Sequence, residues 1–140
     1  MAFTTRTLRD TVVNASGAGG TVTILVNIAD DTTANNAILD ASALDGHANG
    51  AKLHIKRIWW SLVQGTADDN TGHVDIQFKG ASADTVAIRL AGTGHYDGSA
   101  GLIKSSATNT TATSGDLEMS CFGTSGSVII ELIKDENYTS

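Results

Sequence analysis

The sequence predicts an all-β fold: a single-domain antiparallel β-sandwich, jelly-roll-like, with about eight strands. Three observations predict it. Apolar and polar residues alternate along several segments, which is the side-chain period of a strand. Thr, Ser, Asn and Gly supply much of the polar character while charged residues make up only 17%, a mixture that suits strands and turns better than long helices. Glycine-rich turns separate the segments at intervals of about ten residues, a spacing typical of sandwiches and barrels.

Four segments alternate most clearly, and each places its apolar residues on one face: Val22, Ile24, Val26 and Ile28; Val74, Ile76 and Phe78; Val86, Ile88 and Leu90; and Val128, Ile130 and Leu132. Weaker strand candidates are residues 4–13, 37–41, 101–105 and 115–122. The glycine-rich stretch GTGHYDG, residues 92–98, is expected to be a loop.

The longest strand candidate is AKLHIKRIWWSLVQG, residues 51–65, and its apolar pattern changes face in the middle. Leu53 and Ile55 have one parity, whereas Ile58, Trp60 and Leu62 have the other. Two interpretations follow. A β-bulge near Lys56 and Arg57 would flip the register so that all these residues face one core. Otherwise the strand is regular and both faces of its second half are covered.

The adjacent residues Trp59 and Trp60 cannot share one core, because neighbouring side chains of a strand point to opposite faces. An aromatic side chain of this size buries roughly 150–250 Å² when it is covered. Leaving so much apolar surface in water is unusual for a monomer. Either a loop of the same chain or a neighbouring subunit is expected to cover Trp59, and the second alternative predicts a homo-oligomer.

The 140 residues have the length of one domain, so residues 1–140 are expected to form a single sandwich. Residues 1–10 carry only Phe3 and Leu8 as apolar anchors, and they are expected to be either an extended N-terminal arm on a partner or a flexible terminus. Tyr96, beside His95 and Asp97, is expected either to contact a sugar or a protein or to pack within its own loop. The candidate interface residues are therefore Phe3, Leu8, Trp59 and Tyr96.

The charge distribution argues against nucleic acid as a partner, because the net charge is −6 and the nine Lys and Arg residues are scattered. No membrane association is expected, because no apolar run approaches the roughly 18 residues of a spanning helix and the N-terminus has no signal-peptide core.

The sequence gives no positive indication of an enzyme. It has no GxSxG elbow and no HxH, HxxxH or HExxH pattern, so we expect no catalytic residues, no cofactor and no metal site. The single cysteine, Cys121, lies on the apolar parity of LEMSCF, which indicates a buried structural thiol.

Two stretches, ILDASAL and LHIKRIWWS, followed by VDIQFKG and a closing GSVIIELIKDE, resemble the small structural proteins of tailed bacteriophage virions, especially those of phages of marine bacteria. The resemblance covers residues 6–135. It implies a virion component without enzymatic activity, with other virion proteins as partners.

Within the virion, the resemblance favours a capsid decoration or cement protein that binds the major capsid protein. Neck- and tail-associated positions are alternatives. A carbohydrate- or receptor-binding module, which would use exposed aromatics such as Trp59 or Tyr96, is a further alternative.

Overall fold

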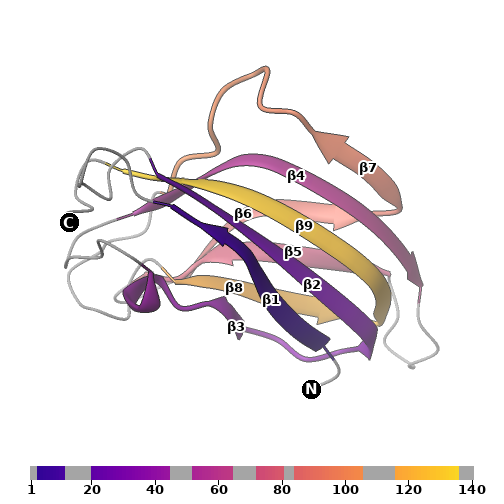
Figure 1. Ribbon diagram of the computed structural model, residues 1–140. Coiled ribbons are helices and arrows are strands. Elements are labelled where there is room, and N and C mark those ends of the chain that lie inside the picture. Colours follow the sequence, from indigo (N-terminus) through magenta and orange to yellow (C-terminus); the bar gives the residue numbers. More distant parts are fainter. Residues whose placement is uncertain are drawn as a thin grey trace.

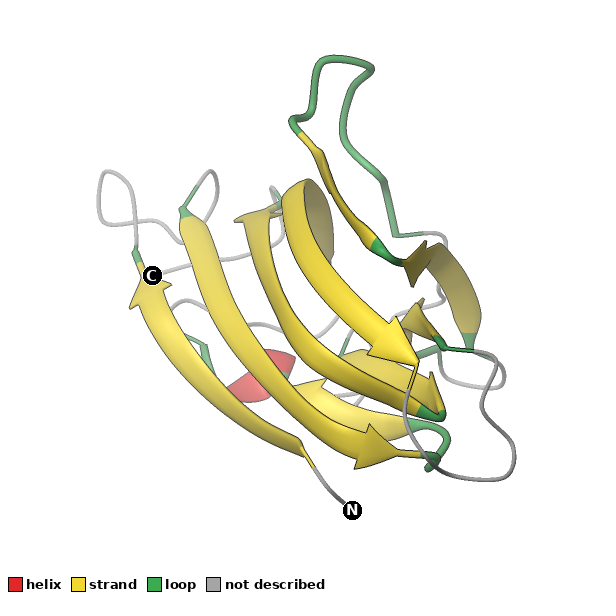
Figure 2. Cartoon of the chain, turned by 90° about the vertical axis from the view of Figure 1, so that its right-hand side faces the viewer, coloured by secondary structure: helices red, strands yellow, loops and turns green. Residues whose placement is uncertain are grey.

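Two antiparallel sheets lie face to face in the computed structural model, which describes residues 3–11, 20–44, 52–64, 72–80, 84–105 and 116–135 (Figures 1 and 2). The five-stranded sheet has the order β1 (Phe3–Asp10), β2 (Thr21–Asp31), β9 (Thr124–Lys134), β4 (Leu53–Gln64) and β7 (Thr93–Tyr96). The four-stranded sheet has the order β3 (Asn36–Leu39), β8 (Leu117–Phe122), β5 (His73–Phe78) and β6 (Thr85–Ala91). A 3-10 turn, η1 (Ala41–Ala43), follows β3. The predicted all-β, antiparallel sandwich is confirmed.

The chain changes sheet at almost every step along these strands. Only β1 to β2 and β5 to β6 connect neighbours within one sheet, and every other connection crosses from one sheet to the other. Adjacent strands in a sheet are therefore mostly distant in sequence, so most strand pairs form only when distant parts of the chain come together.

The core lies between the sheets and is built from the alternating apolar residues of both. The inward faces of β2, β5 and β9 are those predicted, and all of their predicted apolar residues are buried. The prediction for β6 is wrong at one position: Val86 is exposed, because a bulge between Ile76 and Gln77 shifts the register of β5 against β6. Ile88 packs at the edge of the core and Leu90 lies within it.

Strand β4 contains a bulge near Lys56 and Arg57, which is the first of the two alternatives given for this strand. Its pairing with β9 shifts between Ile55 and Arg57, and this brings the apolar residues of both halves to the same side. Leu53, Ile55, Ile58 and Leu62 are buried, and Trp60 is partly buried against the core. The extra residue reverses the parity of the strand, so Trp59 faces outward.

Two local predictions are wrong. GTGHYDG is not a loop throughout, because Thr93–Tyr96 forms strand β7 along the edge of β4. Residues 101–105 do not form a strand, and Ile103 makes only an isolated bridge with Ile55. The other weak candidates correspond to β1, β3 and β8, although residues 12–13 and 115 lie outside the described part of the chain.

Residues 3–10, considered above as an arm, form the edge strand β1, which pairs along its length with β2 (Figure 1). Phe3 packs against the chain's own core at one end. At the other end, the buried Lys134 ammonium contacts Asp10 Oδ1 at 2.5 Å and donates to the Thr11 carbonyl oxygen at 2.9 Å. Between these anchors Thr4 to Arg9 are exposed.

Cys121 is buried, as predicted, and burial together with the neighbouring Asp31 carboxylate raises the pKa of its thiol to about 12. The thiol therefore stays protonated at neutral pH. Across the residues described, no group of three or more His, Cys, Asp or Glu side chains is arranged to hold a metal ion. In the same part of the chain, no helix has the length and apolar character needed to cross a membrane.

Candidate binding face around Trp59

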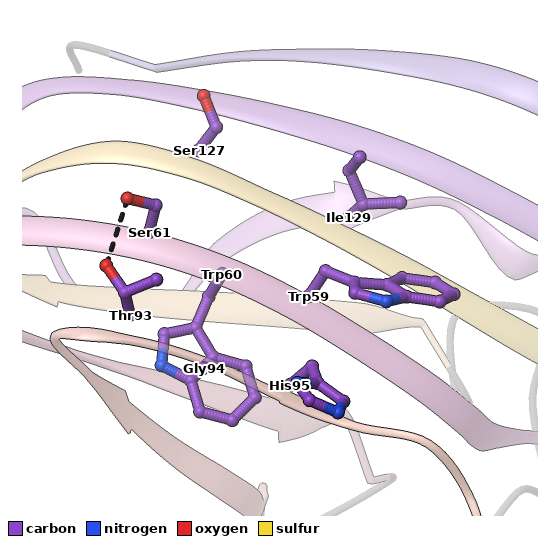
Figure 3. Close-up of a pocket in the computed structure, with 8 residues that line it drawn as sticks. All are labelled: Trp59, Trp60, Ser61, Thr93, Gly94, His95, Ser127 and Ile129. Carbon is purple, nitrogen blue, oxygen red and sulfur yellow. Dashed lines mark hydrogen bonds between the residues drawn. The ribbon is translucent and has the colours of Figure 1, made fainter.

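The outer face of the five-stranded sheet carries Trp59 because the β4 bulge turns Trp60 inward. Trp59 is 40% exposed and is among the few large apolar side chains with this much surface in water. Its indole N–H makes no hydrogen bond within the described residues. The indole rings of Trp59 and Trp60 leave β4 in different directions (Figure 3).

Trp60 is held by contacts that join the two sheets. Its Nε1 donates to the carbonyl oxygen of Ala91, on β6 of the other sheet, at 3.0 Å. Its ring lies against Gly94, where a Cβ atom would come within 2.8 Å of Trp60 Cζ2. A glycine at this position of β7 therefore leaves room for the Trp60 ring.

Two rows of side chains cross this outer face, and the strand register defines both of them. The first row runs Arg6, Leu25, Ile129, Trp59 and His95 on strands β1, β2, β9, β4 and β7. The second runs Thr4, Asn27, Ser127, Ser61 and Thr93 on the same strands. From β2 to β7, a row of apolar and aromatic side chains thus lies directly beside a row of hydroxyl and amide side chains.

A groove lies on the part of this outer face that β4, β7 and β9 form (Figure 3). It has a volume of about 380 Å³, and we call it the Trp59 groove. Its lining residues are Trp59, Ser61, Thr93, His95, Ser127 and Ile129, with Trp60 and Gly94 completing it. No side chain in this lining is an Asp, Glu, Lys or Arg.

The hydroxyl groups of the groove form hydrogen bonds along the second row. Ser61 Oγ and Thr93 Oγ1 lie 3.1 Å apart, and Ser127 Oγ donates to Asn27 Oδ1 at 2.7 Å. Each hydroxyl can both donate and accept, so these bonds leave acceptor capacity for a ligand. The His95 ring makes no hydrogen bond within the described residues and adds further polar capacity.

Charged groups border the groove, and each of them already has a partner. Arg57 Nη1 lies 3.1 Å from Glu131 Oε1, and Lys56 Nζ lies 3.8 Å from the same oxygen. Beyond His95, the backbone N–H of Ser99 donates to Asp97 Oδ1 at 2.9 Å, and this bond lowers the pKa of the Asp97 carboxyl. The groove itself therefore presents an uncharged surface.

The other candidate interface residues lie away from the groove. Phe3 and Leu8 are on β1, at the opposite edge of the sheet from β7, and Leu8 is 49% exposed at a bulge. Tyr96 pairs with Ile58, so it has the parity opposite to that of Trp59, and its hydroxyl donates to the Gly101 carbonyl oxygen. The structure does not bring Phe3, Leu8 or Tyr96 together with Trp59.

Most of the groove lining was not identified from the sequence. Ser61 shares the local parity of Trp59, and that signal could have identified it. Thr93, His95, Ser127 and Ile129 come from strands that are distant in sequence, and only the register of β4 with β7 and β9 places them beside Trp59.

No family model, curated protein or solved structure matches the chain. The fold and this face therefore define its class: an all-β sandwich protein with a solvent-exposed aromatic groove on one sheet.

Proposed function

We propose that the protein is a non-enzymatic structural protein of a tailed-phage virion, and that it decorates the capsid by binding the major capsid protein. The resemblance of ILDASAL and LHIKRIWWS to such proteins supports the proposal. The strand order supports the finer jelly-roll assignment. The order β2-β9-β4-β7 opposite β3-β8-β5-β6 is compatible with two interleaved Greek keys, to which β1 adds an edge strand.

The observation that carries the proposal is the free and exposed edge of strand β1. Within the described residues this strand pairs only with β2, and six consecutive residues, Thr4 to Arg9, are exposed. A free strand edge of this kind offers unpaired backbone groups to a strand of another chain. In this segment Leu8 supplies apolar surface, and Arg6 and Arg9 supply positive charge on a chain of net charge −6.

The anchors of β1 favour attachment without unfolding. Phe3 and the Asp10–Lys134 pair hold its two ends, so the edge is ordered before a partner arrives. A pre-organised edge binds with a smaller loss of conformational entropy. On a capsid, many weak contacts of this kind add through avidity, which is how a small protein reinforces a large shell.

A capsid-binding experiment tests the proposal. Wild type and Leu8→Asp are incubated with purified capsids that lack the protein, and the bound fraction is measured by sedimentation. Val86→Asp is the matched control, because Val86 is 48% exposed, compared with 49% for Leu8, and lies on β6 of the other sheet. We expect Leu8→Asp to reduce binding at least about tenfold, by 1.4 kcal/mol or more, and Val86→Asp to bind like wild type.

Mass spectrometry and electron microscopy of purified virions test the location. Absence of the protein from particles contradicts the proposal, and its presence at the neck or tail selects the alternative position. The predicted homo-oligomer stays a prediction, which sedimentation of the purified chain tests.

A further inference from the structure

We propose that the Trp59 groove is a binding site for a pyranose ring of a neutral glycan. The inference rests on the groove alone and is independent of attachment through β1. The two sites lie at opposite edges of one sheet, so a molecule held through β1 leaves the groove near β7 accessible.

The chemistry of the lining matches both sides of a sugar. A pyranose has an apolar face of C–H groups, which packs on an aromatic ring, and a rim of hydroxyl groups, which need donors and acceptors. Trp59 offers an exposed indole beside Ile129 for the apolar face. Ser61, Thr93 and Ser127 offer hydroxyls for the rim, and the volume of about 380 Å³ suits a small ligand.

The spacing of the two rows allows one ring to use both kinds of contact. Trp59 and Ser61 are two residues apart on β4, which separates their side chains by about 6.6–6.8 Å along the strand. Their neighbours on β7, His95 and Thr93, repeat that spacing one strand away. A ring stacked on the indole therefore brings its hydroxyls toward the hydroxyl row, and the unbonded Trp59 N–H is a further donor.

Other ligand classes fit the groove less well. Protein interfaces are depleted in Ser, and their strongest contacts contain few Ser and Thr, whereas three of the six main lining residues here are Ser or Thr. Nucleic acid requires unpaired cations, but Arg57 beside the groove is paired with Glu131. The net charge of −6 also disfavours sulfated and sialylated glycans, so a neutral sugar fits best.

An NMR titration of the wild-type protein tests the site directly. The chain has two tryptophans and therefore two indole N–H signals, which Trp59→Phe assigns. The probes are the methyl glycosides of glucose, galactose, mannose and N-acetylglucosamine, with sialyllactose as a charged arm. We expect at least one neutral glycoside to shift the Trp59 signal saturably, with a dissociation constant of about 1 mM. The Trp60 signal should shift less than the Trp59 signal, because the Trp60 N–H is already bonded to the Ala91 carbonyl oxygen although its ring also lines the groove.

Variants then assign the binding energy to the groove. We expect Trp59→Ala to weaken binding of the selected glycoside at least about tenfold, and Ser61→Ala to weaken it by a smaller factor. Leu102→Ala is the control, because Leu102 is 38% exposed, compared with 40% for Trp59, and does not line the groove. It should bind like wild type.

Three results would overturn the inference. The first is the absence of any saturable shift of the Trp59 signal with the neutral glycosides. The second is equal affinity of Trp59→Ala and wild type for the glycoside. The third is a wild-type protein that binds no glycoside but whose sedimentation changes in the Trp59→Ala variant. The last result would assign the groove to protein contacts. Loss of capsid binding by Leu8→Asp with retained glycoside binding separates this inference from the proposed function.

Discussion

The indole Nε1 of Trp60 donates a hydrogen bond of 3.0 Å to the carbonyl oxygen of Ala91, and this bond joins the two sheets at their β7 and β6 edge. The β4 bulge makes the bond possible because it turns Trp60 toward the other sheet. The same turn exposes Trp59. The extra residue in β4 therefore places Trp60 against the core, where it stabilises the fold, and places Trp59 on the surface.

The first prediction contrasts the two tryptophans. Trp60→Ala should lower the free energy of unfolding by ~3–5 kcal/mol, because it truncates a ring packed against the core and removes the bond to Ala91. Trp59→Ala should cost only ~1 kcal/mol or less, because its ring faces solvent. Urea unfolding of both variants measures the difference, and a larger loss for Trp59→Ala would contradict the register described above.

The second prediction concerns Gly94. Gly94→Ala should destabilise the protein by ~1–3 kcal/mol, because the new Cβ would lie 2.8 Å from Trp60 Cζ2 and the ring would have to move. In Gly94→Ala/Trp60→Ala the clash is removed. The double variant should therefore be less destabilised than the sum of the two single variants. Simple additivity of the unfolding free energies would show that the two residues do not interact.

The third prediction concerns Glu118 on β8. Burial is the main cause that raises the pKa of the Glu118 carboxyl to about 7, and the nearby Asp84 carboxyl raises it further. The Lys79 ammonium, whose Nζ lies 3.6 Å from Glu118 Oε2, lowers this pKa and so opposes part of the shift. The unfolded chain releases this proton near the ordinary pKa of 4.5, so the stabilising contribution is present at low pH and is lost as pH rises through 7. Wild type should therefore lose stability between about pH 5 and pH 8.

Glu118→Gln cannot titrate and should flatten this part of the stability profile. At pH 8 it should be more stable than wild type by ~2 kcal/mol, because no charge has to form in a buried position. Thermal or urea unfolding across this pH range measures both profiles. If the two profiles ran parallel, the pH dependence would have to come from another group.

The fourth prediction concerns the pair that anchors β1. Asp10→Ala should cost ~3 kcal/mol, because it removes the carboxylate beside a fully buried Lys134 ammonium. Asp10→Ala/Lys134→Met should recover most of the loss, since no buried charge then remains. Asp97→Ala, which removes a carboxylate from an exposed turn, is the control and should be close to neutral. Equal urea midpoints for Asp10→Ala and Asp97→Ala would show that the Asp10–Lys134 ion pair between β1 and β9 does not stabilise the fold.

The sequence by itself determined which side chains face inward along the long strands. The alternation in β2, β5 and β9 predicts their buried faces, and the parity change at Lys56 and Arg57 gives a bulge of β4 as one of two alternatives, of which the structure has the bulge. These features are local, because the side-chain period of a strand depends only on neighbouring residues. The separation of Trp59 from Trp60 follows from the same local geometry.

Only the tertiary structure decided which strands are neighbours, and hence what surrounds Trp59. His95 belongs to a stretch that reads as a loop, yet it lies beside Trp59 because pairing with β4 gives Thr93–Tyr96 its hydrogen-bond partner. Ile129 and Ser127 reach the groove through β9, which lies about 70 residues away along the chain. Val86 is exposed because a bulge shifts its strand. Which strands pair depends on how the whole core packs, and the side-chain period of a single segment does not determine its neighbours.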